Sequence, residues 1–362
     1  MSGNWVRGSI TAGIGAIALM SATNAALAQA ILSTTNGTDT VYLGVRVTGE
    51  LNQVNGPAVN GGAPGATGIA YSGPSTNGSV QDATSPGCLC EGWGVSATSA
   101  TTNTTASGFA NVSSGTGGLS PVSFVTDAPP PAAVPPFGTS ATSTVKISGF
   151  NSLGTGLTVE QAYTVAITGR LFKDTVTITN GTGETLNNLR YVRVMDWDVP
   201  PTEFSEFVTI KGTGTTTDRE FSNDQGFATA DPLAANPPQI VAGTTNTDFV
   251  DSGPADHGAY FRFNFGSLAA GASMSFDIFY GAAPNEALML AALGTAGIEL
   301  YSLGQSSPPL GDPALGTPIT FAFGFAGVGG VPIVPTVPEP GSLALFACAL
   351  AGLVWMRRRK TA

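Results

Sequence analysis

Apolar and polar residues alternate along much of this chain. The pattern is clearest in segments 41–48, 159–167, 172–179, 259–265 and 274–280. In segment 172–179, for instance, Phe172 and Val176 alternate with Lys173 and Thr175. A period of two is that of a β-strand, because successive side chains of a strand point to opposite faces. Half-buried strands of this kind predict an all-β fold in which antiparallel sheets pack as a β-sandwich.

One helix is expected away from the termini, in the segment PNEALMLAALG. Pro284 suits its first turn and Gly294 suits its end. A helix of about eleven residues is marginal alone. We therefore expect it to dock on the sandwich through Leu288, Leu290 or Leu293.

Small polar residues, Gly and Pro dominate residues 55–87 and 98–120, and DAPPPAAVPPFG follows soon after. Such composition is typical of long loops, sheet-edge excursions and a polyproline-like crossing.

The N-terminal residues have the pattern of a secretory signal peptide. Arg7 precedes the apolar run ITAGIGAIALM, and Ala26 and Ala28 frame a cleavage site before Gln29. The chain is thus expected to divide into a signal peptide (1–28), an ectodomain (29–327), a Gly/Pro stalk (328–340), a transmembrane helix (341–356) and a cationic tail (357–362).

The C-terminal residues predict a membrane anchor. Residues 341–356 are apolar or small, and as a helix they would span roughly 24 Å. The tail that follows contains Arg357, Arg358 and Arg359. Because positive charge stays on the cytoplasmic side, we expect the tail inside and the ectodomain outside.

The order of Pro338, Glu339 and Pro340, a short hydrophobic helix and an arginine cluster resembles the PEP-CTERM sorting signal of exported Gram-negative bacterial proteins. In that family the Pro-Glu-Pro is read by exosortase, a membrane protease-transferase that cuts near it. The resemblance implies exosortase and the secretion machinery as partners, and an inner-membrane precursor that reaches the cell surface or extracellular matrix. Hosts of this system usually make exopolysaccharide, which implies a structural or binding role linked to biofilm.

A second resemblance covers most of the ectodomain. The segments CLCEGWGV, RYVRVMDWDVPPTEFSEFVTI and YGAAPNEALMLAALGTAGIELYSLGQ are similar to a recurrent group of exported β-rich bacterial proteins, many with the same sorting signal. The resemblance implies one continuous domain and supplies no catalytic residues.

The net charge of the chain limits the kinds of molecule that it can bind. Only 10% of residues are charged, and without five terminal cations and Glu339, residues 29–338 hold nine Lys and Arg against 23 Asp and Glu, a formal charge of −14. Such a surface repels polyanions, so nucleic acid is excluded as a partner.

Two cysteines, Cys88 and Cys90, lie close together in PGCLCEGWGV. Outside the cytoplasm such thiols tend to oxidise, so the pair is interpreted as a local disulfide or as free thiols that await another partner. The disulfide is favoured over a metal site or a redox site.

The densest chemistry is in RYVRVMDWDVPPTEFSEFVTI. If the strand is regular, Asp196 and Asp198 share a face with Val192 and Val194, just before Pro200. Glu203 and Glu206 follow within a few residues, so the expected cluster consists of Asp196, Asp198, Glu203 and Glu206.

Two interpretations of this cluster stay open. Calcium prefers several oxygen ligands, although the spacing lacks an EF-hand loop. The favoured alternative is that Arg190, Arg193 or Arg219 and backbone N–H groups neutralise the carboxylates. Calcium is therefore the one cofactor considered.

Catalysis has little support. No GxSxG elbow or phosphate-binding loop is present, and the single histidine, His257, is interpreted as a turn residue. Asp196 with Glu203 or Glu206 would suit a glycosidase, but carboxylate pairs are common in this chain. We therefore expect an exported structural or binding protein and not an enzyme. A calcium-dependent carbohydrate-binding or adhesive sandwich is the alternative, and a secreted hydrolase is the third.

Overall fold

The computed structural model describes residues 29–53, 65–129, 136–150, 154–308 and 312–333. The signal peptide, Pro338, Glu339, Pro340, the expected transmembrane helix and Arg357, Arg358 and Arg359 lie outside these residues. Among the described residues, no helix has the length and apolar character needed to cross a membrane.

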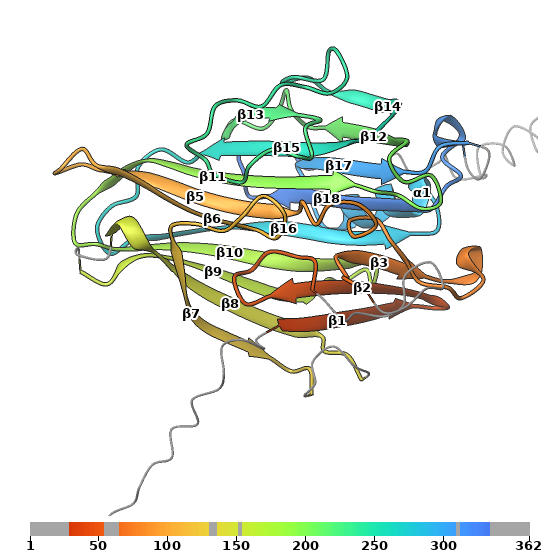
Figure 1. The fold of residues 1–362 in the computed structure, drawn as a ribbon, viewed down its shortest axis with the longest axis horizontal. Helices are drawn as coiled ribbons and strands as arrows, with labels where there is room; N and C mark the ends of the chain where they lie inside the picture. The colour runs from red at the N-terminus through yellow and green to blue at the C-terminus, as the bar shows by residue number, and fades with distance from the viewer. Residues whose placement is uncertain (1–28, 54–64, 130–135, 151–153, 309–311, 334–362) are drawn as a thin grey trace, which may run out of the picture.

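The strands form three sheets in which every neighbouring pair of named strands is antiparallel (Figure 1). The largest sheet has nine strands, in the order β14 (Phe249–Ala255), β12 (Glu206–Lys211), β17 (Leu300–Gln305), β18 (Thr320–Ala326), β16 (Ser273–Ala283), β10 (Leu171–Gly181), β9 (Gly156–Val165), β8 (Ser140–Ile147) and β7 (Leu119–Thr126).

The two smaller sheets lie over different parts of the nine-stranded sheet (Figure 1). The five-stranded sheet has the order β13 (Arg219–Asn223), β15 (His257–Asn264), β11 (Leu186–Trp197), β5 (Gly92–Ser99) and β6 (Thr105–Asn111). The four-stranded sheet has the order β1 (Gln29–Asn36), β2 (Asp39–Arg46), β3 (Ile69–Ser72) and β4 (Gln81–Asp82). Short 3-10 turns occur at Pro74–Thr76, Ser148–Phe150 and Pro313–Leu315.

Aromatic side chains fill the main core between the layers. The Tyr191 ring of β11 meets the Phe276 ring of β16 at 4.9 Å between centroids, and Phe263 of β15 meets Phe325 of β18 at 4.8 Å. Residues of the four-stranded sheet, including Leu43, belong to the same core. The predicted all-β antiparallel architecture is thus confirmed, because the alternating faces find apolar partners across the sandwich.

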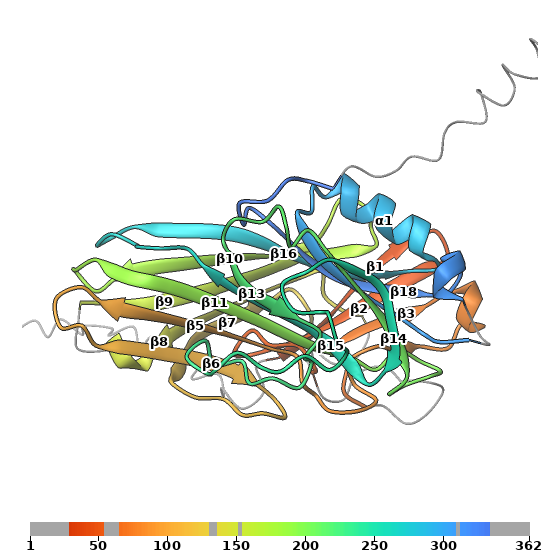
Figure 2. The ribbon, with the colours of Figure 1, turned by 90° about the horizontal axis from the view of Figure 1, so that it is seen from above.

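The helix α1 (Glu286–Thr295) lies on the other side of the nine-stranded sheet from β11 and β15 (Figure 2). Leu293 docks as expected, and Met289 docks beside it, whereas Leu288 is exposed. The boundaries of the helix in the structure differ from those predicted from the sequence. Asn285 caps the N-terminus by accepting the Leu288 N–H, and the helix continues through Gly294.

Some expected loops are strands. The Gly- and Ser-rich segments contain β3, β4 and β6, whose small residues fit where neighbouring backbones approach closely. A Cβ on Gly94 of β5, for example, would lie 2.1 Å from the Ala230 carbonyl oxygen. At the start of the expected stalk, Val328 is buried and the Ile333 N–H donates to the Ile298 carbonyl.

Candidate functional site

Asp196 and Asp198 lie at the C-terminal end of β11, as the sequence predicts. Val192 and Val194 pack in a small outer cluster, whereas Trp197 packs in the main core. The alternation along β11 therefore places the two carboxylates on the face away from the main core.

A third carboxylate, Asp256, comes from a distant part of the sequence. Asp196 pairs with Gly258 and Trp197 pairs with His257, so Asp256 lies opposite the end of β11. Oxygens of Asp196, Asp198 and Asp256 lie within 4.8 Å of one another. We call these three residues the acidic cluster. Asp198 exposes 0% and Asp196 1% of their surface, whereas Asp256 is exposed at the rim.

Glu206 lies near the acidic cluster but its oxygens have other partners. Oε1 accepts the His257 N–H at 2.9 Å and Oε2 accepts the Ser205 N–H at 3.0 Å. Glu203 adds to the negative charge felt by Asp198. The structure thus places Glu203 and Glu206 beside the two aspartates and brings Asp256 into closer contact with them.

The expectation that arginines neutralise the cluster is wrong. Arg190 pairs with Glu220 at 2.7 Å, Arg193 pairs with Glu91, and Arg219 donates to the Thr213 carbonyl and to Asn246. Within the described ranges, no Lys or Arg forms an ion pair with the acidic cluster.

The electrostatics of the acidic cluster follow from this lack of countercharge. Burial, with the charges of Asp198 and Asp256, raises the pKa of Asp196 to about 8. Burial and the charge of Asp256 raise the pKa of Asp198 to about 7. The nearby Gly87 N–H acts to lower this pKa, although neither oxygen of Asp198 has a hydrogen bond of normal geometry. Burial also raises the pKa of Glu206 to about 9, against the effect of the His257 N–H. Ionising these groups together is therefore unfavourable unless a positive charge binds.

The loop before β5 forms one wall of the acidic cluster. Cys88 and Cys90 are joined in a disulfide, and Cys88 Sγ lies 3.3 Å from Asp196 Oδ2. Gly87 lies against Asp198 so closely that a Cβ there would be 2.6 Å from Oδ1. The disulfide and a glycine thus let this loop approach both aspartates.

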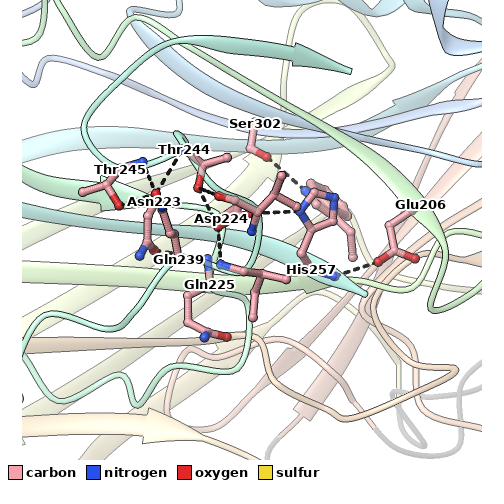
Figure 3. A network of polar contacts seen from close by, with 12 residues as sticks. Glu206, Asn223, Asp224, Gln225, Gln239, Thr244, Thr245, His257 and Ser302 are labelled. Atoms are coloured by element: carbon pink, nitrogen blue, oxygen red, sulfur yellow. Dashed lines mark hydrogen bonds and ion pairs between the residues drawn. The ribbon is translucent and has the colours of Figure 1, made fainter. Parts of the chain in front are cut away.

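His257 is not a turn residue, contrary to the sequence interpretation. It is the first residue of β15, is fully buried, and its Nδ1 lies 3.0 Å from Asp224 Oδ2 (Figure 3). Asp224 also accepts hydrogen bonds from the Ile240 and Val241 N–H groups and from the Thr244 hydroxyl. Burial acts to raise the pKa of Asp224, but these three bonds and the contact with His257 together lower it. This arrangement holds the loop after β13 against β15.

A second polar network lies in the main core. Arg193 donates to Gln161 Oε1 at 2.9 Å and lies over the Tyr280 ring, 5.1 Å from its centroid. Asp174 is fully buried nearby, and burial raises its pKa to about 8, against the attraction of Arg193.

Sequence reasoning missed Asp256, and it missed that Gly87 lies against Asp198 and Gly226 against Asp196. The only available signal for Asp256 was its position directly before an alternating segment. Strand pairing, which placed it opposite Asp198, depends on the tertiary fold.

Comparisons with known proteins identify the C-terminal segment. The PEP-CTERM protein-sorting motif matches residues 336–360. Among curated proteins, no sequence matches the chain. A galactose mutarotase-like protein from Lactobacillus casei ATCC 334 is similar in structure with a TM-score of 0.31 and 7% identity, over 82% of this chain and 88% of that one. A likeness of that size carries no argument about function. The chain carries a PEP-CTERM sorting motif and is therefore an exported protein that is membrane-anchored until exosortase processes it.

Proposed function

We propose that the processed protein is a non-enzymatic component of the cell surface or extracellular matrix that binds a neutral, hydroxyl-rich polymer such as exopolysaccharide. The observation that carries the proposal is an open face of Ser and Thr side chains on the outer side of the nine-stranded sheet. We call it the hydroxyl face. It consists of Thr142, Thr144, Thr158, Thr164, Thr175, Thr177, Thr179, Ser273 and Ser275.

Strand register makes this face a regular array. Thr177 of β10 lies opposite Ser275 of β16, and Thr179 lies opposite Ser273. Their hydroxyl oxygens are 3.0 Å and 2.8 Å apart in the two pairs. A hydroxyl both donates and accepts, so rows of hydroxyls in register offer repeated partners for the hydroxyls of a sugar chain.

Charge favours a neutral polymer on this face. The face carries two positive and two negative side chains, Lys146, Lys173, Glu160 and Asp277, so its formal charge is zero. Residues 29–338 as a whole carry a formal charge of −14. Lys173 and Asp277 also lie close enough to pair, at 3.5 Å. An uncharged chain can therefore approach the face without the repulsion that an anionic polymer meets.

Burial of the carboxylates supports binding over hydrolysis. A glycosidase places its two carboxyl groups against the glycosidic bond. The sequence offered Asp196 with Glu203 or Glu206; Asp196 exposes 1% and Glu206 0% of its surface, whereas Glu203 is partly exposed. A polymer cannot reach Asp196 or Glu206 in this conformation, and both candidate pairs require Asp196.

Co-sedimentation with exopolysaccharide from the host tests the proposal. The processed protein should bind saturably, and replacing Thr144, Thr158 and Thr177 by Val should weaken binding while preserving shape. The matched control replaces Thr98 and Thr105 by Val, because these exposed residues form a hydroxyl pair at 2.9 Å in the five-stranded sheet. Lack of saturable binding, or equal loss in both variants, would refute the assignment.

A further inference from the structure

We propose that Asp196, Asp198 and Asp256 bind a divalent cation and that Ca²⁺ is the ion their oxygens suit best. The site would join the end of β11, the start of β15 and the loop that contains Cys88. The proposal is independent of polymer binding, because the acidic cluster lies at the end of β11 and just before β15, whereas the hydroxyl face lies on β8, β9, β10 and β16.

The first argument is the missing countercharge. Three carboxylates have oxygens within 4.8 Å, two of them are buried, and no Lys or Arg in the described part of the chain pairs with them. Buried carboxylates are normally paired with a cation or coordinate a metal. Arg190, Arg193 and Arg219 are bound to other residues, so the three carboxylates can ionise together only if a cation binds between them.

The second argument is independent of charge and concerns unused hydrogen-bonding capacity. Both carboxylate oxygens of Asp198 and Oδ1 of Asp196 are buried without a hydrogen-bond partner in the described ranges. Buried polar atoms usually have partners, and an unpaired one destabilises the fold by about 1–3 kcal/mol. Oxygens that face one another without donors have the arrangement of ligands around an ion.

The surroundings suit a small ion. Two glycines from different loops lie against the carboxylates, and a Cβ on Gly87 or on Gly226 would be 2.6 Å from an oxygen of Asp198 or Asp196. Asp256 is exposed, so the acidic cluster opens to solvent on one side. An ion can therefore enter from the rim and complete its coordination with water.

The ligand chemistry selects the type of ion. Three carboxylates supply up to six hard oxygen donors, and Ca²⁺ takes about six to eight oxygens in flexible geometry. Zn²⁺ favours thiolate and imidazole ligands, but Cys88 and Cys90 are oxidised to a disulfide, and the ligand atoms that lie together in the acidic cluster are carboxylate oxygens without an imidazole nitrogen. Mg²⁺ requires nearly ideal octahedral geometry, which is harder to meet with carboxylates held by two strands and a loop.

Calcium titration of the processed protein tests the site, by calorimetry and by thermal unfolding in Ca²⁺, Mg²⁺, Zn²⁺ or EDTA. The measurements are best made at pH 8, because protons compete for carboxylates whose pKa is raised. We expect saturable binding of one Ca²⁺ and an increase in Tm that EDTA reverses. The increase should exceed those in equal concentrations of Mg²⁺ and Zn²⁺.

Three variants make the test specific. Asp198→Asn should abolish the calcium-dependent rise in Tm, and Asp256→Asn, at an exposed position with little risk of misfolding, should weaken calcium binding at least tenfold. Asp174→Asn is the matched control, since Asp174 is also fully buried with unpaired oxygens but lies in the main core. It should keep the wild-type response. Absence of binding to any of the three ions, or equal responses in all variants, would overturn the site, and a preference for Mg²⁺ or Zn²⁺ would overturn the choice of calcium.

Discussion

Arg193 of β11 and Glu91, which directly precedes β5, form an ion pair in which neither side chain is exposed to solvent. The pair is also linked to the opposite sheet, because Arg193 donates to Gln161 of β9. Glu91 Oε2 in turn accepts the Leu51 N–H at 2.6 Å. One guanidinium thus connects both layers of the sandwich with the segment after β2, and this connection commits the arginine to the core.

Arg193→Met should strongly destabilise the fold. Removing one partner of a buried ion pair leaves the other charge uncompensated, at a cost of about 3–5 kcal/mol. Chemical denaturation at pH 8 measures the change in the free energy of unfolding.

The double variant Arg193→Met with Glu91→Gln is the control. It also removes the stranded carboxylate, so it should be more stable than Arg193→Met alone. If the single variant is as stable as the wild type, the pair does not contribute to folding as described.

Asp174 should make the stability of the protein depend on pH. Burial raises its pKa to about 8, above the value expected in the unfolded chain, so the folded state binds its proton more tightly. The stability from this group is fully present below the unfolded-state pKa and is lost as pH rises through about 8. Two nearby charges act on the pKa of Asp174 in opposite directions: Arg193 lowers it and Glu91 raises it.

Thermal unfolding in EDTA between pH 6 and pH 9.5 checks this effect. Asp174→Asn cannot ionise, so the decrease in Tm over this range should be smaller than in the wild type. Glu160→Gln, at an exposed position, is the control and should leave the decrease unchanged. An identical pH profile for Asp174→Asn and the wild type would show that Asp174 is not protonated in the folded state.

Gly87→Ala should damage the acidic cluster by crowding. The new Cβ would lie 2.6 and 2.8 Å from the Asp198 carboxylate oxygens and 2.7 Å from Phe204 Cε1. We expect a loss of about 1–3 kcal/mol, typical of overpacking, and weaker calcium binding.

Gly214→Ala is a matched control, because a Cβ there would have no atom within 4 Å. Its Tm should stay close to that of the wild type with and without calcium. Unchanged calcium binding in Gly87→Ala would mean that the loop does not border the site.

Replacing Pro338, Glu339 and Pro340 by alanine should leave the precursor in the inner membrane. The matched motif begins at residue 336, and the resemblance assigns exosortase recognition to this tripeptide. Fractionation of host cells with an antibody to the ectodomain follows the protein. Pro335→Ala, just outside the motif, should be processed normally, and normal release of the triple variant would contradict recognition of these residues.

Local patterns predicted much of the fold. The faces of β11 followed from alternation alone, because every second side chain of a strand points the same way whatever lies beside it. The helix at Glu286–Thr295 was predicted from local start and stop residues such as Pro284, although Gly294 did not end it. Strands built from small residues, such as β6, were missed because their composition also suits loops.

Strand partners could not be predicted in this way. β10 and β11 are consecutive in the chain, yet they lie in opposite layers of the sandwich. Pairing depends on contacts between distant segments, and an alternating pattern does not specify which segment supplies them.

The sorting motif and the all-β character of this protein could be recognised before the fold was known, because sorting signals and strand periodicity are properties of short contiguous segments. Which charges meet depends on how the strands pack in three dimensions. This packing directed Arg193 inward to Glu91 and placed Asp256 opposite Asp198. The reason is physical: the energy of a buried charge depends on the groups that distant strands bring next to it.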